Sequence, residues 1–459
     1  MKRTLLLFVL FLDSLSGVAQ TQPSPRTLSL QEYLTWVDQY HPLLKAVGNR
    51  LPIAKAERLK ARGAFDPTLV GDFASKEFKG EEYYRLPSWS LKSNTRGPVA
   101  VSLDWNQTAG LYTNPQDQLP EEGLFAVGGM VQLGNGLITD KRRTDLALAK
   151  AAVGLTEAQA ELYRNELLLK ASKAYWKWYS THQSLGAYEK AIAAAREVYA
   201  FTMQSFTAGD ASAMDTLDAS ALLSTWQADY YNARKDAIEA LFEASNWLWD
   251  LDGNPVVLHS ESIPTFDDPF ELRTAKLDED HPLVRYNSQK EKQLRIKRTL
   301  AREYLKPKVA VGGALIVAGN VNDLPETSEL NTGDRLLKAK VEMPLLLREG
   351  RGYSRSTNLS LQSFQWERAA SENAWNNDMT ATANAILQLE QGVKVSIRNQ
   401  RAMEDLLAAE KQKLEFGDSE LIKVNLRTSY FLKSVIQTAK MQAELGIKKA
   451  EMKELTASY

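Results

Sequence analysis

Few residues in this 459-residue sequence could do covalent or metal chemistry. None of its four histidines stands at metal-ligand spacing from another; they are His41, His182, His259 and His281. Cysteine is absent, so the chain offers neither a thiolate metal site nor a thiol nucleophile. The sequence also contains no Gly-rich phosphate loop and no nucleophile elbow. We therefore expect no enzymatic activity, no cofactor and no metal site.

Two Gly-Asp turns between helical patterns are the candidate binding residues instead. The first turn contains Phe206, Gly209, Asp210 and Ser212, and the second contains Leu414, Gly417, Asp418 and Ser419. Glycine permits a positive φ and close backbone approach, and an acid beside it can cap the returning helix. Each turn therefore predicts the tip of a helical hairpin, and it would close that hairpin whether or not a partner binds there.

Long helices must position these tips. The segment from Asp140 to Phe206 contains no proline and could form one helix on the order of 100 Å long. Large residues recur every seven positions with mostly small residues three positions later: Leu148, Leu155, Leu162, Leu169 and Trp176, then Ala151, Ala158, Asn165, Ser172 and Tyr179. This spacing is typical of close coiled-coil packing, with an ordinary bundle helix as the alternative. A second proline-free segment runs from Arg351 to Leu414.

The β segments show a different period. Apolar residues alternate with polar or small ones from Thr68, over 99–106 and 125–133, and again over 308–317 and 336–343. We expect two hairpins, hence about four strands, with one apolar face and one face that carries Lys338, Lys340 and Glu342. That alternation is typical of a transmembrane β-barrel. Four strands cannot close a barrel, so three chains would have to share one of 12; a soluble β-domain covered by helices is the alternative.

The two halves of the chain repeat one pattern. His281-Pro282 repeats His41-Pro42 at an offset of 240 residues, and the two Gly-Asp turns are 208 residues apart. The offset between the repeats falls from 240 before the strands to 210 at the last strand of each β segment. The first repeat therefore contains about 30 extra residues between its strands. A length change confined to one place indicates one supersecondary unit used twice.

The N-terminus has the composition of a secretory signal peptide over residues 1–19. A basic start is followed by a short apolar run and small residues before Gln20. The formal net charge of −1 gives no reason to expect a nucleic-acid partner.

On these features the chain resembles the outer membrane efflux protein (TolC) family over nearly all of the mature sequence. The matching motifs are Leu28-Ser29-Leu30-Gln31-Glu32 with His41-Pro42, the strand-entry Pro67 and Pro307, Asp140-Lys141-Arg142, Gly350-Arg351, and the turns Phe206-x-x-Gly209 and Leu414-x-x-Gly417. Each motif is degenerate, whereas their order, spacing and duplication are specific.

The resemblance implies a mainly α protein with β, built from two internal repeats as a homotrimer. Long coiled-coil hairpins would form a periplasmic α-barrel, and four strands per chain would contribute to a 12-stranded outer-membrane β-barrel. Such a protein is the exit duct of a tripartite efflux or type I secretion system, with outer-membrane lipid, a periplasmic adaptor (membrane fusion) protein and an inner-membrane transporter as partners. The competing interpretation is a periplasmic coiled-coil scaffold with a soluble β-domain.

The resemblance also assigns roles to the turns. The eight turn residues named above would meet the adaptor's helical hairpins, and Asp210 and Asp418 predict a basic or amide group on the partner. Some members narrow the entrance with a ring of acids just beyond the tip, where this chain has Lys423. Our hypothesis is that Asp215 pairs with Lys423 between neighbouring hairpins and holds the entrance closed, with Asp218 nearby; a solvated surface charge is the alternative.

The expected segments follow from these boundaries. They are a signal peptide (1–19), an N-terminal periplasmic helix (20–66), a first β segment with extracellular loops (67–139), a first helical hairpin (140–251), a linker (252–280), a second-repeat helix (281–306), a second β hairpin (307–348) and a second helical hairpin (349–459).

Overall fold

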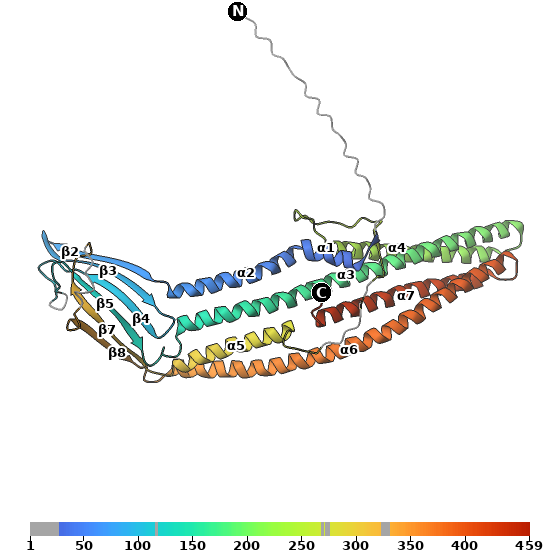
Figure 1. Ribbon diagram of the computed structural model, residues 1–459. Helices are drawn as coiled ribbons and strands as arrows, with labels where there is room; N and C mark the ends of the chain where they lie inside the picture. The colour runs from blue at the N-terminus through green and yellow to red at the C-terminus, as the bar shows by residue number, and fades with distance from the viewer. Residues whose placement is uncertain (1–26, 115–117, 268–269, 271–275, 323–330) are drawn as a thin grey trace, which may run out of the picture.

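The computed structural model describes residues 27–114, 118–267, 270, 276–322 and 331–459. The chain is a long wall of helices that continues at one end into a β-sheet and ends at the other in two helical turns (Figure 1). The TolC-like fold expected from the sequence is therefore confirmed. The expected signal peptide, residues 1–19, lies outside the described residues.

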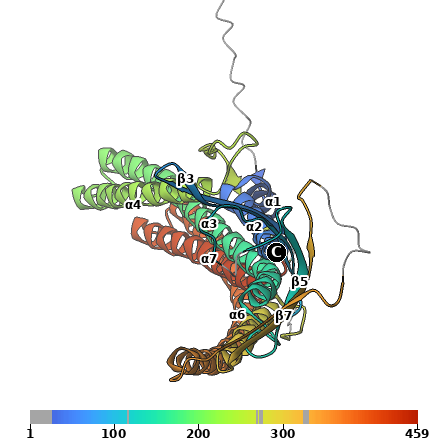
Figure 2. The same ribbon diagram turned by 90° about the vertical axis from the view of Figure 1, so that its left-hand side faces the viewer.

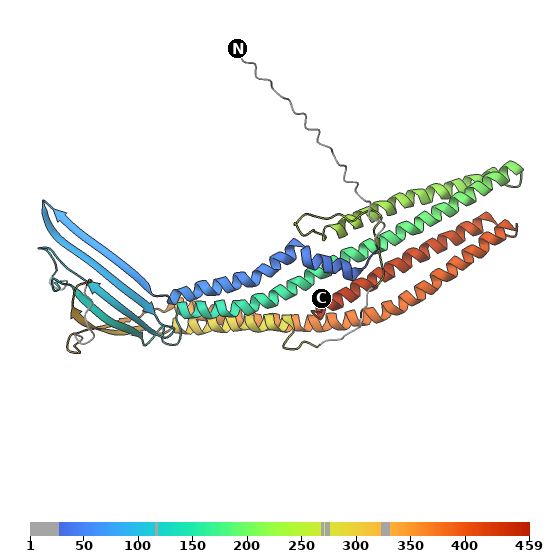
Figure 3. The same cartoon turned by 45° about the horizontal axis from the view of Figure 1, so that its top comes forward.

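Seven α-helices of the described chain build the wall. They are α1 (Leu30–Tyr40), α2 (Pro42–Arg62), α3 (Lys141–Ala208), α4 (Ala213–Ser245), α5 (Pro282–Glu303), α6 (Arg348–Glu415) and α7 (Leu421–Leu455). Next to the sheet, α3 packs between α2 and α5, and α5 packs on α6. Toward the tips α3 packs between α4 and α7, and α7 packs on α6. The two 68-residue helices α3 and α6 thus run the whole length of the wall (Figure 3).

Both repeats begin with the same helix cap. Nδ1 of His41 accepts a hydrogen bond from the backbone N–H of Leu43 at 3.3 Å, and Nδ1 of His281 accepts one from Leu283 at 3.2 Å. In each case proline occupies the first helical position, where its missing N–H leaves no donor unsatisfied. The upstream helix α1 has the expected capping box of Ser29 and Glu32.

The heptad row along α3 packs largely as its spacing predicts. The row of small residues, from Ala151 through Ala158 and Asn165 to Ser172, is buried, whereas the leucine row is half-buried until Trp176, which is fully buried. Trp176 lies against Gly446 of α7, where an added Cβ would come within 2.1 Å of the indole ring. This contact joins the two repeats near the middle of the wall.

The sheet has six strands, and the expected count of four was wrong. Its order is β2 (Thr68–Phe78), β3 (Glu81–Asn94), β4 (Val99–Asn106), β5 (Leu124–Gln132), β7 (Lys308–Ala318) and β8 (Arg335–Glu342), all antiparallel. Five of the six strands coincide with the alternating stretches of the sequence, and the one that no alternation indicated is β3. Lys79 and Gly80 join β3 to β2 through a tight turn with positive φ at both residues. A lysine at the first position of that turn lacks the usual Asn-Gly or Asp-Gly signal, so the hairpin escaped the sequence pattern.

The remaining elements are short. β1 (Thr27–Leu28) and β6 (Ile263–Pro264) form a parallel pair beside α3, and a single 3-10 turn, Gly63–Phe65, leads from α2 into the sheet. Among the described residues no helix is both long and apolar enough to cross a bilayer.

Substitution of Gly446 by alanine should destabilise the chain because the new methyl group would overlap the buried ring of Trp176. Overpacking of this kind costs about 1–3 kcal/mol, so thermal unfolding of the purified full chain should shift to lower temperature. Gly186→Ala is the matched control, since no atom lies within 4 Å of its added Cβ. There the gain of about 0.5–1 kcal/mol in helix propensity should raise the midpoint. Equal effects of both variants would contradict the packing described here.

The cap at His41 should make stability depend on pH. Burial lowers the pKa of His41, so the folded chain binds this proton more weakly than the unfolded chain, in which histidine titrates near 6.5. Stability from this group is therefore complete above pH 6.5 and falls as the pH drops toward the folded pKa. Asparagine is a good N-cap without a titratable ring, so His41→Asn should flatten this dependence in urea unfolding curves.

Burial lowers the pKa of His182 as well, so His182→Gln is the companion variant. A slope that stays unchanged in His41→Asn but disappears in His182→Gln would assign the effect to His182.

Candidate partner-contact tips and channel wall

The first tip is a helix C-cap built on glycine. Gly209 has φ of 90°, its N–H donates to the carbonyl of Phe206 at 3.1 Å, and the N–H of Asp210 donates to that of Ser205 at 2.9 Å. These two bonds form a Schellman motif, which requires a left-handed residue that glycine adopts without strain. The predicted residues Phe206, Gly209 and Asp210 are all exposed.

The second tip repeats this geometry. Gly417 has φ of 77°, its N–H donates to the carbonyl of Leu414 at 3.0 Å, and the N–H of Asp418 donates to that of Lys413 at 2.9 Å. Gly417 and Asp418 are exposed, and Leu414 is half-buried. The structure thus places the residues of the two predicted turns in matching conformations at one end of the wall (Figure 1).

The helices that leave the two tips begin differently. Ser212 caps α4: its backbone N–H and its hydroxyl each donate to the Asp215 carboxylate at 2.8 Å. These two hydrogen bonds hold the pKa of the Asp215 carboxyl below its usual value. At the second tip Ser419 donates instead to Glu410 of α6 at 2.6 Å, and this bond lowers the pKa of Glu410.

The predicted entrance residues have partners within their own hairpin. Asp215 belongs to the capping box of α4, and the Lys423 ammonium lies 3.6 Å from the carboxylate of Glu420. Asp218 is exposed on the first turns of α4. Near the tips another ion pair joins the two hairpins of one chain: Lys411 of α6 and Glu197 of α3, whose charged atoms are 3.0 Å apart. Sequence reasoning missed this pair because the two residues are 214 positions apart and meet only in the folded wall.

Exposed apolar side chains surround both tips, and most of them were not predicted. Phe416 is 78% exposed and stands directly before Gly417. Other exposed residues on the first turns of the returning helices are Met214, Leu217, Ile422 and Leu426. A contiguous set of exposed large apolar residues is typical of a protein-contact surface. The sequence could have indicated these residues, because they are apolar, lie next to the Gly-Asp turns and do not occupy the heptad positions that are buried.

At the opposite end of the molecule, one face of the sheet is apolar and exposed. The pairing register aligns a continuous row across five strands: Leu69, Leu91, Leu103, Val127 and Leu315. The face carries further exposed residues, among them Phe73, Trp89, Leu337 and Val341. Phe73 is 65% exposed and Leu337 is 72% exposed, so no helix of the described chain covers this face.

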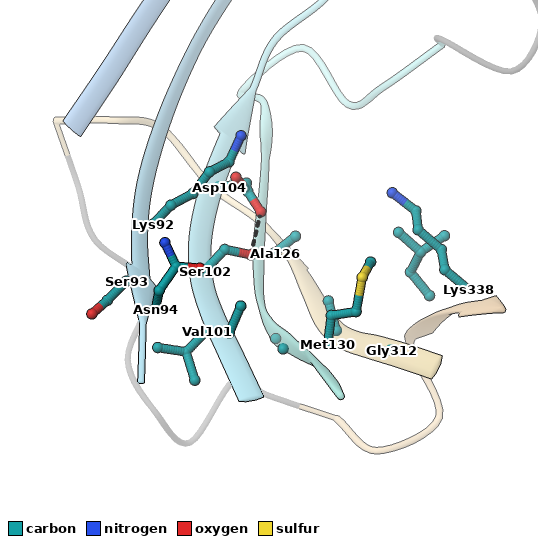
Figure 4. A pocket seen from close by; sticks show the side chains of 16 residues that line it. Lys92, Ser93, Asn94, Val101, Ser102, Asp104, Ala126, Met130, Gly312 and Lys338 are labelled. Carbon is teal, nitrogen blue, oxygen red and sulfur yellow. Dashed lines mark hydrogen bonds between the residues drawn. The ribbon is translucent and has the colours of Figure 1, made fainter. Parts of the chain in front are cut away.

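The other face of the sheet is polar and concave. It encloses a hollow of about 300 Å³ lined by Lys92, Ser102, Asp104 and Lys338, by small residues such as Gly128 and Gly312, and by the apolar Met130 and Leu336 (Figure 4). The Ser102 hydroxyl donates to Asp104 at 2.8 Å. Seen from the sheet end, the strands form an arc that continues the curve of the helical wall (Figure 2). The sheet therefore presents a wettable inner surface and an apolar outer surface.

The described residues contain no group of three or more His, Cys, Asp or Glu side chains that could hold a metal ion.

Comparisons with known proteins agree with this architecture. The model of the outer membrane efflux protein family matches residues 130–243, which include the last strand of the first β segment and the first helical hairpin. A search of the curated proteins finds no significant match to this sequence.

Solved structures share the fold of nearly the whole chain. The Campylobacter jejuni CmeC outer membrane channel is 12% identical with a TM-score of 0.65, over 93% of this chain and 85% of that one. The outer membrane protein VceC of Vibrio cholerae is 11% identical with a TM-score of 0.64, over 93% and 96%. The open state of the Neisseria gonorrhoeae MtrE outer membrane channel is 13% identical with a TM-score of 0.61, over 93% and 88%.

At these identities the likeness to solved structures is one of fold, and the family match rests on the sequence of residues 130–243. The sequence of residues 130–243 thus matches the outer membrane efflux protein family, and the described chain as a whole has the TolC-like fold.

Proposed function

We propose that this chain is the outer-membrane exit duct of an efflux or type I secretion system. The observation that carries the proposal is the sheet, whose exposed apolar face lies opposite a concave polar face lined by Lys92, Asp104 and Lys338. An apolar face of this size requires a cover, and lipid supplies one when the other face lines water. The strands have 8 to 14 residues, which is about the length that crosses a bilayer when tilted.

The duct requires more than one copy of the chain. Six strands and a curved wall one helix thick leave both lateral edges of the chain open, so we propose the homotrimer. Exposed apolar residues line both edges of the wall, Ile53 and Leu59 on α2 and Leu359 and Trp366 on α6. Neighbouring copies would bury them, and the helices would then enclose a channel through the periplasm.

The tips are the proposed contact surface for a periplasmic adaptor protein, through which an inner-membrane transporter would be reached. Phe206, Ser212, Leu414 and Ser419, with the glycines and acids between them, form the turns, and Phe416 and Ile422 add exposed apolar area. We propose that the energy for export comes from the transporter and that the duct itself catalyses no reaction.

A periplasmic scaffold with a soluble β-domain is the second candidate. It would leave the apolar face of the sheet in water or against a protein, so the two candidates differ in their need for lipid.

Cell fractionation and the mass of the extracted particle test the duct. We expect the chain in the outer-membrane fraction, released only by detergent, with a protein mass of three chains after correction for bound detergent. A monomer that is released without detergent would overturn the proposal and favour the scaffold.

Paired substitutions on β8 separate lipid contact from general disruption. Leu337→Arg places a charge on the apolar face, which costs about 2–4 kcal/mol at the middle of a bilayer, and should reduce the amount of assembled protein in the membrane. Lys338→Arg, its neighbour on the polar face, should leave assembly unchanged. Equal assembly of both variants would contradict burial of this face in lipid.

Conductance in planar bilayers tests the entrance. We propose that Lys411 and Glu197 hold the two hairpins of each chain together in the closed state. An exposed pair contributes about 0–1 kcal/mol, so Lys411→Glu should shift the ratio of open to closed channel by up to about fivefold toward open. The reversal Glu197→Lys with Lys411→Glu should restore the closed state.

Lys423→Ala is measured beside these variants because it tests the Asp215–Lys423 pair proposed between neighbouring hairpins. If Lys423→Ala changes conductance and Lys411→Glu does not, the entrance is held by the Asp215–Lys423 pair. If neither does, the closed state depends on neither pair.

A further inference from the structure

The 30 extra residues of the first repeat correspond to one additional hairpin. β2 and β7 follow the equivalent Pro67 and Pro307, and the equivalent Val131 and Val341 lie near the ends of β5 and β8. In the second repeat β7 connects directly to β8, whereas in the first repeat β3 and β4 stand between β2 and β5. The insertion is therefore a pair of strands within the sheet.

This hairpin follows the inside-outside alternation of its neighbours. Trp89 and Leu91 of β3 pair with Trp105 and Leu103 of β4 on the apolar face. Lys92, the residue after Leu91, points to the opposite face of the sheet and lines the polar hollow (Figure 4). A hairpin that projected from the sheet as a surface loop would have no reason to keep one face apolar.

The outer strands of the sheet have matching open edges. All eleven residues of β2 and all eight of β8 are exposed, and within the described residues each strand pairs on one side only. β2 leaves the helical wall and β8 returns to it, so β8 of one copy would lie antiparallel to β2 of the next. On the polar face β2 carries Asp72 and Lys76, and β8 carries Lys338, Lys340 and Glu342, so each edge offers charged groups of both signs to the other.

We propose that β2 of each copy pairs with β8 of the next, so that three copies close a barrel of 18 strands. This inference rests on the proposed function as an outer-membrane duct, and it replaces the 12 strands implied by the family resemblance. The number is even, as bacterial outer-membrane barrels require.

The widths of the two parts of the wall fit this number. Four helices at about 8–10 Å spacing span an arc of about 32–40 Å. Six strands about 4.8 Å apart and tilted by about 40° span about 38 Å. The barrel can therefore continue the helical duct at nearly the same width.

The inner face of the sheet keeps this lumen open. Small residues, including Ala126, Gly128, Gly312 and Ala314, line the hollow. Because barrel diameter grows roughly linearly with strand number, 18 strands enclose about twice the cross-section of 12. The duct would accordingly pass larger solutes than a 12-stranded outlet.

Cysteine labelling of the full-length protein tests whether β3 is part of the barrel, since the native chain has no cysteine to interfere. In Lys92→Cys a charged, water-soluble thiol reagent should react and lower single-channel conductance. In Leu91→Cys the charged reagent should not react, because the thiol would face lipid, and only a membrane-permeant maleimide should label it. Lys338→Cys and Leu337→Cys on β8 form the matched pair on a strand whose place in the barrel does not depend on the extra hairpin.

Two outcomes would overturn different claims. If Leu337→Cys and Leu91→Cys both react with the charged reagent and no conductance appears, the proposed function fails. If the β8 pair behaves as a lipid face and a lumen face but both β3 variants react with the charged reagent without changing conductance, only the 18-stranded barrel fails.

Two further measurements test the barrel size and its closure. Deletion of residues 79–106 removes β3 and β4 yet leaves β2 connected to β5 through the natural loop, and it should lower conductance about twofold; unchanged conductance would overturn the proposal. For closure, Phe73→Cys combined with Leu337→Cys should yield covalent trimers on treatment with flexible bifunctional maleimides. If chains that assemble and conduct give no cross-linked species with any spacer length, the β2–β8 contact is excluded.

Discussion

A wall only one element thick is the constraint on which the rest of this structure depends. Each helix and each strand of such a wall has two neighbours and two open faces, so the chain cannot hide its apolar surface around a single central core. The buried residues accordingly form separate clusters along the wall, one around Trp176, one around Trp226 and one around Trp375. The apolar surface left over, along the edges and over the outside of the sheet, stays exposed in the single chain.

The same constraint explains why the middle of the wall has a second layer of packing and the tips do not. Trp176, Tyr175 and Tyr33 lie where α1 and the β1–β6 pair add a second layer to the wall. The hydroxyl of Tyr33 donates to the backbone carbonyl of Ala244, and that of Tyr175 donates to the carbonyl of Leu28. Toward the tips the layer is single again, and the hairpins meet there through the cluster around Trp226, which includes Leu432 of α7, and through the partly exposed Lys411–Glu197 ion pair. Salt weakens pairs of that kind, whereas it leaves the aromatic layer intact.

Much of the fold could be read from the sequence because its signals are local and repeated. Heptad spacing predicted the 68-residue α3, glycine marked both tips, and the offset between repeats located the extra residues of the first β segment. The strand β3 was missed because its turn, Lys79-Gly80, carries a weak signal and because alternation is hard to see around Pro87. The Lys411–Glu197 pair could not be foreseen, since two residues 214 positions apart meet only through packing.

The contact between Trp176 and Gly446 shows that the two halves of the chain are no longer interchangeable. At the repeat offset of the tips, Gly446 corresponds to Ile238, which is 48% exposed on α4, and Trp176 corresponds to the exposed Asn384 of α6. A chain made of two first halves would press isoleucine against the indole, and one made of two second halves would lose the indole altogether. The two halves of the chain therefore differ at this contact: only the first half supplies the indole ring, and only the second supplies the space that receives it.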